Sequence, residues 1–134
     1  MSTIQDISIL KIPVIEDLSG NLAFVQNEIL PFEFKRVYYL FDVPSSAFRG
    51  GHSHIDQQEV LIALSGSFEV TVDDGINKKS FLLNKPNVGL HLPKEIWREL
   101  DNFSSGAVCL VFASDVFEEA DYIRDYDTFL NSKK

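Results

Sequence analysis

Cysteine is nearly absent from this chain of 134 residues. The single cysteine, Cys109, stands in an apolar run and has no partner for an internal disulfide, so we expect it to be a core residue. Basic residues are also scarce, since 12 Lys and Arg against 20 Asp and Glu give a net charge of −8. A surface of this sign repels nucleic acid and anionic membranes, so we expect neither as a partner.

Long apolar stretches are missing as well. No run approaches the roughly 20 residues needed to cross a bilayer. The first six residues lack the basic and apolar regions of a secretion signal, so we expect a cytoplasmic location. Hydrophobic residues nevertheless make up 45% of the chain, which is enough for one core. The length suits one domain that covers residues 1–134.

Short apolar segments separated by turns dominate the sequence. In the segment 66–73, Phe68, Val70 and Val72 alternate with polar residues, and Asp73-Asp74-Gly75 predicts a hairpin turn after it. Eight further strands are predicted at 7–12, 21–25, 36–42, 59–64, 79–83, 88–92, 96–100 and 107–114. Only the segment 118–131 is expected to be helical, in short pieces. Many short strands with little helix predict an all-β sandwich or barrel.

Two of the three histidines, His52 and His54, follow Arg49-Gly50-Gly51 and lie two residues apart. In a strand, such positions project from the same face, so both imidazoles would face one space. Glu59 follows five residues after His54, and Gly66 seven residues later, which is the spacing of the first cupin motif. We therefore expect a cupin-type β-barrel, or jelly roll. The alternative is that the pair lies in a glycine-rich surface loop.

The second cupin motif places a histidine four residues before an asparagine. Here Asn102 occupies the asparagine position, and Arg98 stands where the histidine belongs. Two histidines and Glu59 could form a three-ligand metal site, but an arginine does not coordinate metals and keeps its charge. We therefore expect a cavity without metal or cofactor, in which imidazoles transfer protons to and from a bound anion.

Arginine is rare and concentrated near these motifs. Of the four arginines, Arg36 opens an aromatic strand, Arg49 precedes the histidine pair and Arg98 fills the motif position. A planar guanidinium matches phosphate oxygens, so these residues predict an anion clamp. The alternative is that each arginine pairs with a nearby carboxylate.

Together these motifs resemble the dTDP-4-keto-6-deoxyglucose 3,4-ketoisomerases, a family of cupins without metal. The similarity runs in register over most of the chain, through residues 35–39, 49–54, 65–67, 73–75, 89–90, 97–99, 103–105 and 113–124. It implies an enzyme that moves the carbonyl of a dTDP-linked 4-keto-6-deoxy-hexose from C4 to C3 through an enediol, in an amino-sugar pathway that serves lipopolysaccharide or another glycan. It also implies a homodimer that exchanges N-terminal strands between subunits.

The resemblance assigns roles to individual residues. His54 is the expected base at C3, and His52 and Tyr39 are expected to relay or orient protons. Six further residues are expected to bind the substrate: Arg36, Arg49, Arg98, Glu59, Trp97 and Arg124. The arginines matching the family's pyrophosphate contacts are Arg36 and Arg49.

The chain departs from the family pattern at three positions. Ser19 stands where a bulky Arg or Tyr is common, Glu59 where Gln is common, and His91 where an aromatic residue is common. Arg98, in place of a histidine, implies an equatorial C4 hydroxyl in the product. Three alternatives stay open: a metal-dependent cupin that uses His52, His54 and Glu59, a small-molecule binding module, and a nucleotide-sugar epimerase.

Overall fold

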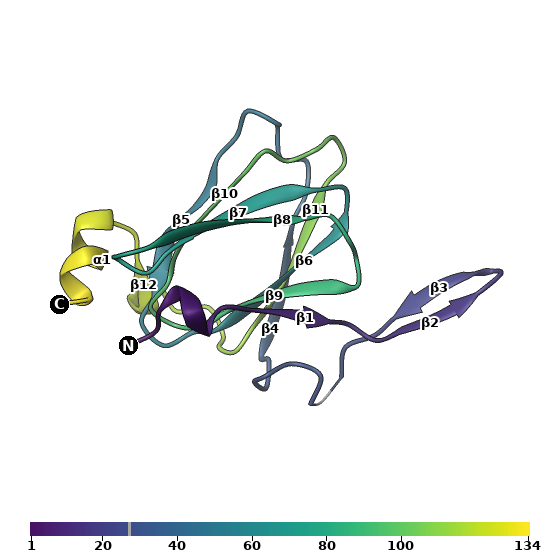
Figure 1. Ribbon diagram of the computed structural model, residues 1–134, viewed down its shortest axis with the longest axis horizontal. Coiled ribbons are helices and arrows are strands. Elements are labelled where there is room, and N and C mark those ends of the chain that lie inside the picture. The colour runs from purple at the N-terminus through teal and green to yellow at the C-terminus, as the bar shows by residue number, and fades with distance from the viewer. Residues whose placement is uncertain (27) are drawn as a thin grey trace.

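Two five-stranded antiparallel sheets form a barrel in the computed structural model, which describes residues 1–26 and 28–134 (Figure 1). The first sheet has the order β1 (Ser8–Lys11), β9 (Val88–Leu92), β6 (Glu59–Ser65), β11 (Val108–Ala113) and β4 (Arg36–Leu40). The second has the order β12 (Tyr122–Ile123), β5 (Arg49–His54), β10 (Trp97–Asp101), β7 (Phe68–Asp73) and β8 (Lys78–Leu83). This arrangement confirms the predicted all-β, cupin-type jelly roll.

Five elements of the described chain lie outside these sheets. They are the hairpin of β2 (Val14–Asp17) and β3 (Gly20–Ala23), the 3-10 helices η1 (Ile4–Asp6) and η2 (Glu119–Asp121), and the helix α1 (Tyr126–Ser132). Each of the nine predicted strand segments contains a strand, whereas β2, β5 and β12 were not among them. The predicted helical pieces near the C-terminus are confirmed as η2 and α1, with β12 between them. No helix in the described part of the chain is long and apolar enough to cross a membrane.

The barrel interior is filled by the alternating face of β7 and its neighbours. Phe68, Val70 and Val72 are fully buried, and Phe68 stacks on Phe103 with ring centroids 5.1 Å apart. Cys109 lies in the same cluster, as its apolar neighbours predicted. Burial of each large apolar side chain contributes about 1.5–3 kcal/mol, so this cluster holds the two sheets face to face.

The predicted turn after β7 is confirmed by its hydrogen bonds. Gly75 has φ +96°, which glycine adopts without strain, and the Asp74 carboxylate accepts bonds from the amides of Ile76 and Asn77 at 2.9 and 2.7 Å. The turn fixes the pairing of β7 with β8. Because β10 pairs with the other edge of β7, this hairpin also supports the strand that carries Arg98.

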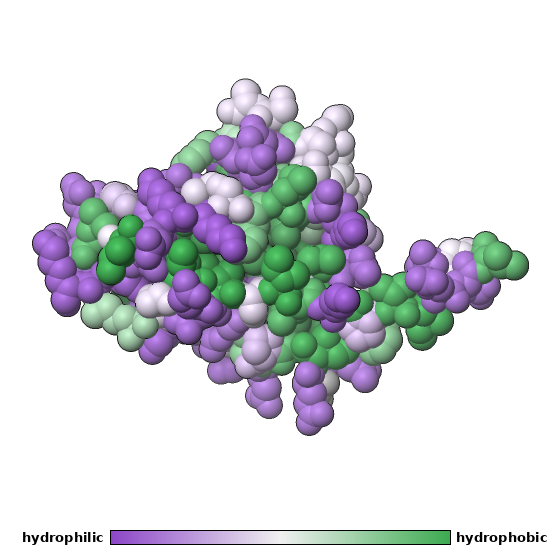
Figure 2. All heavy atoms as spheres, in the orientation of Figure 1, coloured by the Kyte–Doolittle hydropathy of each residue, from purple (hydrophilic) through white to green (hydrophobic). Residues whose placement is uncertain are grey.

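Two features project from the barrel in Figure 1. The helix α1 covers the outer face of the second sheet through Phe129, which is fully buried and packs on Trp97. The hairpin β2–β3 extends away from the barrel and exposes Ile15, Leu18 and Leu22, so that hydrophobic side chains stand in solvent along it (Figure 2).

Candidate active site

The strand β5 carries the histidine pair into the barrel by means of a β-bulge. Gly50 and Gly51 have φ values of +86° and +67°, which favour glycine. Opposite them, the register of β10 shifts, so that Arg98 faces His52 whereas Glu99 faces Gly50, and Gly51 is the extra residue. The bulge thus sets His52 beside Arg98.

Both imidazoles lie on the inner face of this strand. The ring centroids of His52 and His54 are 4.9 Å apart, edge to face. The shared face predicted from their spacing is therefore confirmed, and the alternative of a surface loop is wrong. The glycines do not make a loop here because a bulge accommodates them within the ladder.

A cavity of about 610 Å³ opens beside the first of these histidines. Its polar lining combines four cations, two phenols, one imidazole and one carboxylate: Arg36, Arg49, Arg98, Arg124, Tyr38, Tyr122, His52 and Glu59. Apolar side chains complete the wall, and Phe48 and Phe117 among them are more than half exposed. Such a cavity offers cationic and aromatic contacts to an anionic ligand.

His52 is the imidazole that faces this cavity. Neither ring nitrogen has a hydrogen-bond partner among the described residues, although both atoms are buried. Burial, together with the nearby charge of Arg98, lowers the pKa of His52 to about 3. The ring is therefore neutral near pH 7, and the lone pair on one ring nitrogen has no hydrogen-bond partner among the described residues.

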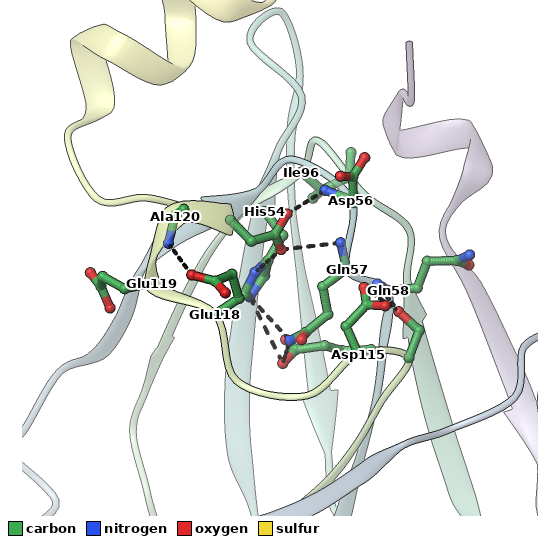
Figure 3. Close-up of polar contacts among 12 residues, drawn as sticks. His54, Asp56, Gln57, Gln58, Ile96, Asp115, Glu118, Glu119 and Ala120 are labelled. Carbon is green, nitrogen blue, oxygen red and sulfur yellow. Dashed lines mark hydrogen bonds and ion pairs between the residues drawn. The ribbon is translucent and has the colours of Figure 1, made fainter.

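His54 is fully buried and does not line the cavity. Its Nδ1 is 3.0 Å from a carboxylate oxygen of Asp121, which requires Nδ1 to carry the proton and leaves Nε2 as an acceptor. Gln57 Nε2 lies 3.5 Å from that Nε2, and Figure 3 shows this side chain reaching toward the ring. Asp121 also accepts the backbone amides of Asp56 and Gln57 at 2.7 and 3.2 Å, which fixes it in place.

A buried ion pair closes the inner end of the cavity. Arg98 Nη1 donates to Glu59, and both side chains are almost completely buried. The Tyr38 hydroxyl donates to the same carboxylate at 2.7 Å, and its pKa is raised mainly by burial and also by the Glu59 charge. The Tyr38 hydroxyl is therefore protonated at any working pH.

The other three arginines lie nearer solvent. Arg36 is half-buried, donates to Gln57 Oε1 at 3.2 Å and stacks over the Tyr38 ring at 4.9 Å. Arg49 is exposed at the cavity. Arg124 is bonded to Glu119 through two nitrogens, at 2.7 and 3.0 Å. The alternative of local carboxylate pairing thus holds for Arg98 and Arg124. Among the residues that the structure describes, no ion pair with Arg36 or Arg49 is found.

Two predicted site residues lie outside the cavity. Tyr39 is 60% exposed on the outer face of β4, next to Phe41, whereas its neighbour Tyr38 points inward. Trp97 precedes Arg98 on β10 and so points to the opposite face, where it packs on Tyr126 at 5.3 Å under α1. Both expectations are corrected by strand alternation. The same rule, applied to Arg36 as an inward residue, would have selected Tyr38.

Tyr122, Phe48 and Phe117 also line the cavity and were missed as site residues. Tyr122 pairs with β5 through the short strand β12, and its ring centroid is 5.1 Å from that of His52. A two-residue strand in a polar segment gives no periodicity. The sequence offered no signal for its position beyond the resemblance.

The metal alternative was tested on the donor atoms. One ligand atom from each of His52, His54 and Glu59 lies within 4.8 Å of the others, which is close enough for a shared cation. However, Glu59 is bonded to the guanidinium of Arg98, and His54 Nε2 faces the Gln57 amide. A permanent cation at this carboxylate opposes a metal ion by repulsion, so the donor set fits a metal poorly.

Comparison with known proteins agrees with this geometry. The family model described as FdtA, WxcM-like, C-terminal, matches residues 5–134. A TDP-4-oxo-6-deoxy-alpha-D-glucose-3,4-oxoisomerase from Aneurinibacillus thermoaerophilus is 42% identical over 116 residues, which are 87% of this chain and 84% of that protein. The chain belongs to the sugar-nucleotide 3,4-ketoisomerase family.

Solved structures of such ketoisomerases superpose closely on this one. A 3,4-ketoisomerase from Helicobacter canadensis is 46% identical, with a TM-score of 0.93 over 96% of this chain and 97% of that chain. A TDP-quinovose 3,4-ketoisomerase from Campylobacter jejuni is 44% identical, with a TM-score of 0.90 over 95% and 98%. The predicted family and enzyme class of this ketoisomerase are thereby confirmed.

Proposed function

We propose that this ketoisomerase converts a dTDP-linked 4-keto-6-deoxy-glucose into its 3-keto isomer. The observation that carries the proposal is His52, a neutral imidazole with unpartnered ring nitrogens in a cationic cavity. The name of the Aneurinibacillus relative supports the substrate. Abstraction of a proton next to a carbonyl needs such a base, together with cations or donors near the developing enolate oxygen.

The reaction is a proton-transfer sequence that balances without a cofactor. The base removes the proton from C3, next to the C4 carbonyl, and the electron pair moves onto O4 to give an enediolate. The proton of O3 passes to O4, C4 takes up a solvent-derived proton from a donor on the opposite face of the ring, and the base releases the C3 proton to solvent as the C3 carbonyl forms. Substrate and product have the same atoms and the same oxidation state overall.

We assign the base to His52 rather than to His54, which was expected from the resemblance. The cavity reaches His52, whereas both ring nitrogens of His54 face protein groups. His54 supports the site instead, because its bond to Asp121 fixes the edge against which the His52 ring packs. Tyr38 replaces Tyr39 as the phenol next to the sugar.

The nucleotide end of the substrate is proposed to occupy the outer part of the cavity. Arg36 and Arg49 line it without a carboxylate partner in the described chain, so their guanidinium groups are available to the pyrophosphate. Arg124 adds a third cation at this end, moderated by Glu119. Arg98 lies deeper, next to His52, where a fixed cation stabilises the enediolate.

The product is proposed to be dTDP-3-keto-6-deoxyglucose, with an equatorial C4 hydroxyl, for an amino-sugar pathway. Arg98 supports this assignment because a guanidinium stays protonated and is a poor proton donor to C4. H3 and H4 of a glucose ring lie on opposite faces, so an equatorial C4 hydroxyl requires that C4 receive its proton on the face opposite to the base. The Campylobacter relative, named for TDP-quinovose, supports the same gluco series.

A homodimer with exchanged N-terminal strands is part of the proposal, as is a cytoplasmic location. An isolated two-stranded hairpin is at best marginally stable in water, yet β2–β3 projects from the barrel with Leu18 and Leu22 exposed (Figure 1). The outer face of the edge strand β4 exposes Val37 and Tyr39. A second copy would cover these surfaces, and sedimentation equilibrium tests this.

The decisive experiment is incubation with dTDP-4-keto-6-deoxyglucose in deuterated water, followed by NMR. We expect a 3-keto product with solvent deuterium at C4, and, in a parallel incubation in ordinary water, a large coupling between H4 and H5. A small coupling would contradict the equatorial assignment alone. Failure to form any 3-keto product would refute the proposed function.

A further inference from the structure

Glu59 bridges the two sheets inside the barrel. It begins β6 in the first sheet, is 2% exposed, and bonds to Arg98 on β10 in the second sheet. A buried carboxylate is costly unless its charge and lone pairs are satisfied. The way in which this one is satisfied determines the orientation of its neighbours.

Three donors from three segments converge on this carboxylate. Oε1 accepts from Arg98 Nη1. Oε2 accepts from the Tyr38 hydroxyl of β4 at 2.7 Å and from Gln57 Nε2 at 3.0 Å. A carboxylate is an acceptor only, so every one of these groups is obliged to donate toward Glu59.

The guanidinium of Arg98 is held by acceptors on two sides. Its Nε and Nη2 donate to the Ile96 carbonyl at 3.3 and 3.1 Å, and Nη1 donates to Glu59. The plane of the group is thereby fixed beside His52, its partner across the ladder.

The consequence for Tyr38 is a fixed hydrogen-bond direction. A phenol has one proton to donate, and that proton is used on Glu59. The lone pairs of Tyr38 remain for the cavity that the residue lines. Tyr38 therefore offers the cavity a hydrogen-bond acceptor, because its one proton is used on Glu59.

We propose that Glu59 is a positioning residue, which orients Tyr38 as an acceptor and Arg98 as a fixed cation without itself contacting the reacting atoms. The proposal rests on the proposed function and extends it. It replaces the expected role of Glu59 in substrate binding, because both carboxylate oxygens are already engaged by protein donors.

The test is the isosteric variant Glu59→Gln. Its amide group has one acceptor and one donor end, so either Tyr38 or Arg98 loses its acceptor. Many members of the family carry Gln at this position, so we expect turnover to persist; because the amide in this chain leaves the buried Arg98 or Tyr38 without an acceptor, kcat should fall by about 10- to 100-fold, whereas the dissociation constant for TDP should stay within about twofold. The matched control is Glu99→Gln, which removes a carboxylate bonded to Trp97 outside the barrel and should leave kcat unchanged.

A double variant separates positioning from independent effects. If Glu59 acts through Tyr38, the loss in Tyr38→Phe/Glu59→Gln is smaller than the product of the two single losses. A crystal structure of Glu59→Gln with TDP should show Tyr38 or Arg98 displaced.

Three results would overturn the proposal: wild-type kcat in Glu59→Gln, losses that multiply in the double variant, or TDP binding weakened as much as kcat. If the wild-type enzyme gives no 3-keto product, the proposed function fails and this role fails with it. If the wild type is active and Glu59→Gln matches it, only the positioning role fails.

Discussion

Replacing His52 or His54 by asparagine distinguishes the roles of the two imidazoles. In His52→Asn the cavity loses the imidazole that we propose as the base, and removal of a general base lowers the rate by about 10²- to 10⁴-fold, or about 2.7–5.4 kcal/mol in the barrier. Because the His52 ring nitrogens have no hydrogen bonds within the described chain, the free energy of unfolding should change little.

In His54→Asn we expect a larger loss of stability and a smaller loss of rate than in His52→Asn. The bond to Asp121 is lost in a fully buried position, which should lower the free energy of unfolding by about 1–3 kcal/mol. Asp121 keeps its two backbone amide donors, so the variant should still fold. We expect reduced but measurable turnover, since the base remains and only its packing partner changes.

The assay is single-turnover NMR in deuterated water, with thermal unfolding measured on the same samples. Binding of TDP to each variant shows that the cavity is intact. Wild-type turnover in His52→Asn would refute the assignment of the base. Complete loss of turnover in a folded His54→Asn, with His52→Asn active, would restore the assignment expected from the resemblance.

Five further results are expected. Burial and Arg98 lower the pKa of His52 to about 3, so kcat/KM should stay flat from pH 8 to 5. With an unshifted histidine as the base, kcat/KM at pH 5 would be about 30-fold lower than at pH 8. A decrease of kcat/KM near pH 6.5 would contradict the lowered pKa. The unfolded state takes up this proton first, so stability should decrease as the pH falls below 6.5 toward 3, as acid titration of unfolding would show. Arg49→Ala should raise KM more than it lowers kcat in steady-state kinetics, because a remote phosphate contact supplies uniform binding. Trp97→Phe should lower the melting temperature by several degrees but leave KM unchanged, since the indole packs under α1. Dialysis against a chelator, followed by metal analysis, should leave activity intact; loss of activity with loss of a stoichiometric metal would revive the site of His52, His54 and Glu59.

The fold was predictable because its signals are local. Alternation in the segment 66–73 and the turn at Asp74 depend on a few neighbouring residues, and both are present in the structure. The strand β5 was harder to predict, because two consecutive glycines, Gly50 and Gly51, are typical of a loop and only their pairing with β10 shows that they lie in a strand. A bulge is defined by the partner strand, which no local pattern contains.

The site was predictable by residue type but not by orientation. His52, Glu59 and the four arginines were all expected at the cavity, and the structure places them there. The structure places Tyr39 and Trp97 outside the cavity, because successive residues of a strand point to opposite faces. Which face is inward depends on the register of each strand, and two adjacent aromatic residues do not reveal it.

Arg98 links the electrostatics of the site to its chemistry. Burial, together with its charge, lowers the pKa of His52, so the imidazole is unprotonated near pH 7. In the proposed mechanism, the same charge would stabilise the enediolate that proton abstraction from C3 creates. Without a carboxylate partner, the Arg98 guanidinium could bind a phosphate of the substrate at the inner end of the cavity. The pairing with Glu59 fixes it at the inner end of the cavity, and leaves the pyrophosphate to Arg36 and Arg49. A histidine at the position of Arg98 could give its proton to the sugar, whereas the guanidinium keeps its protons, so Arg98 is not expected to protonate C4.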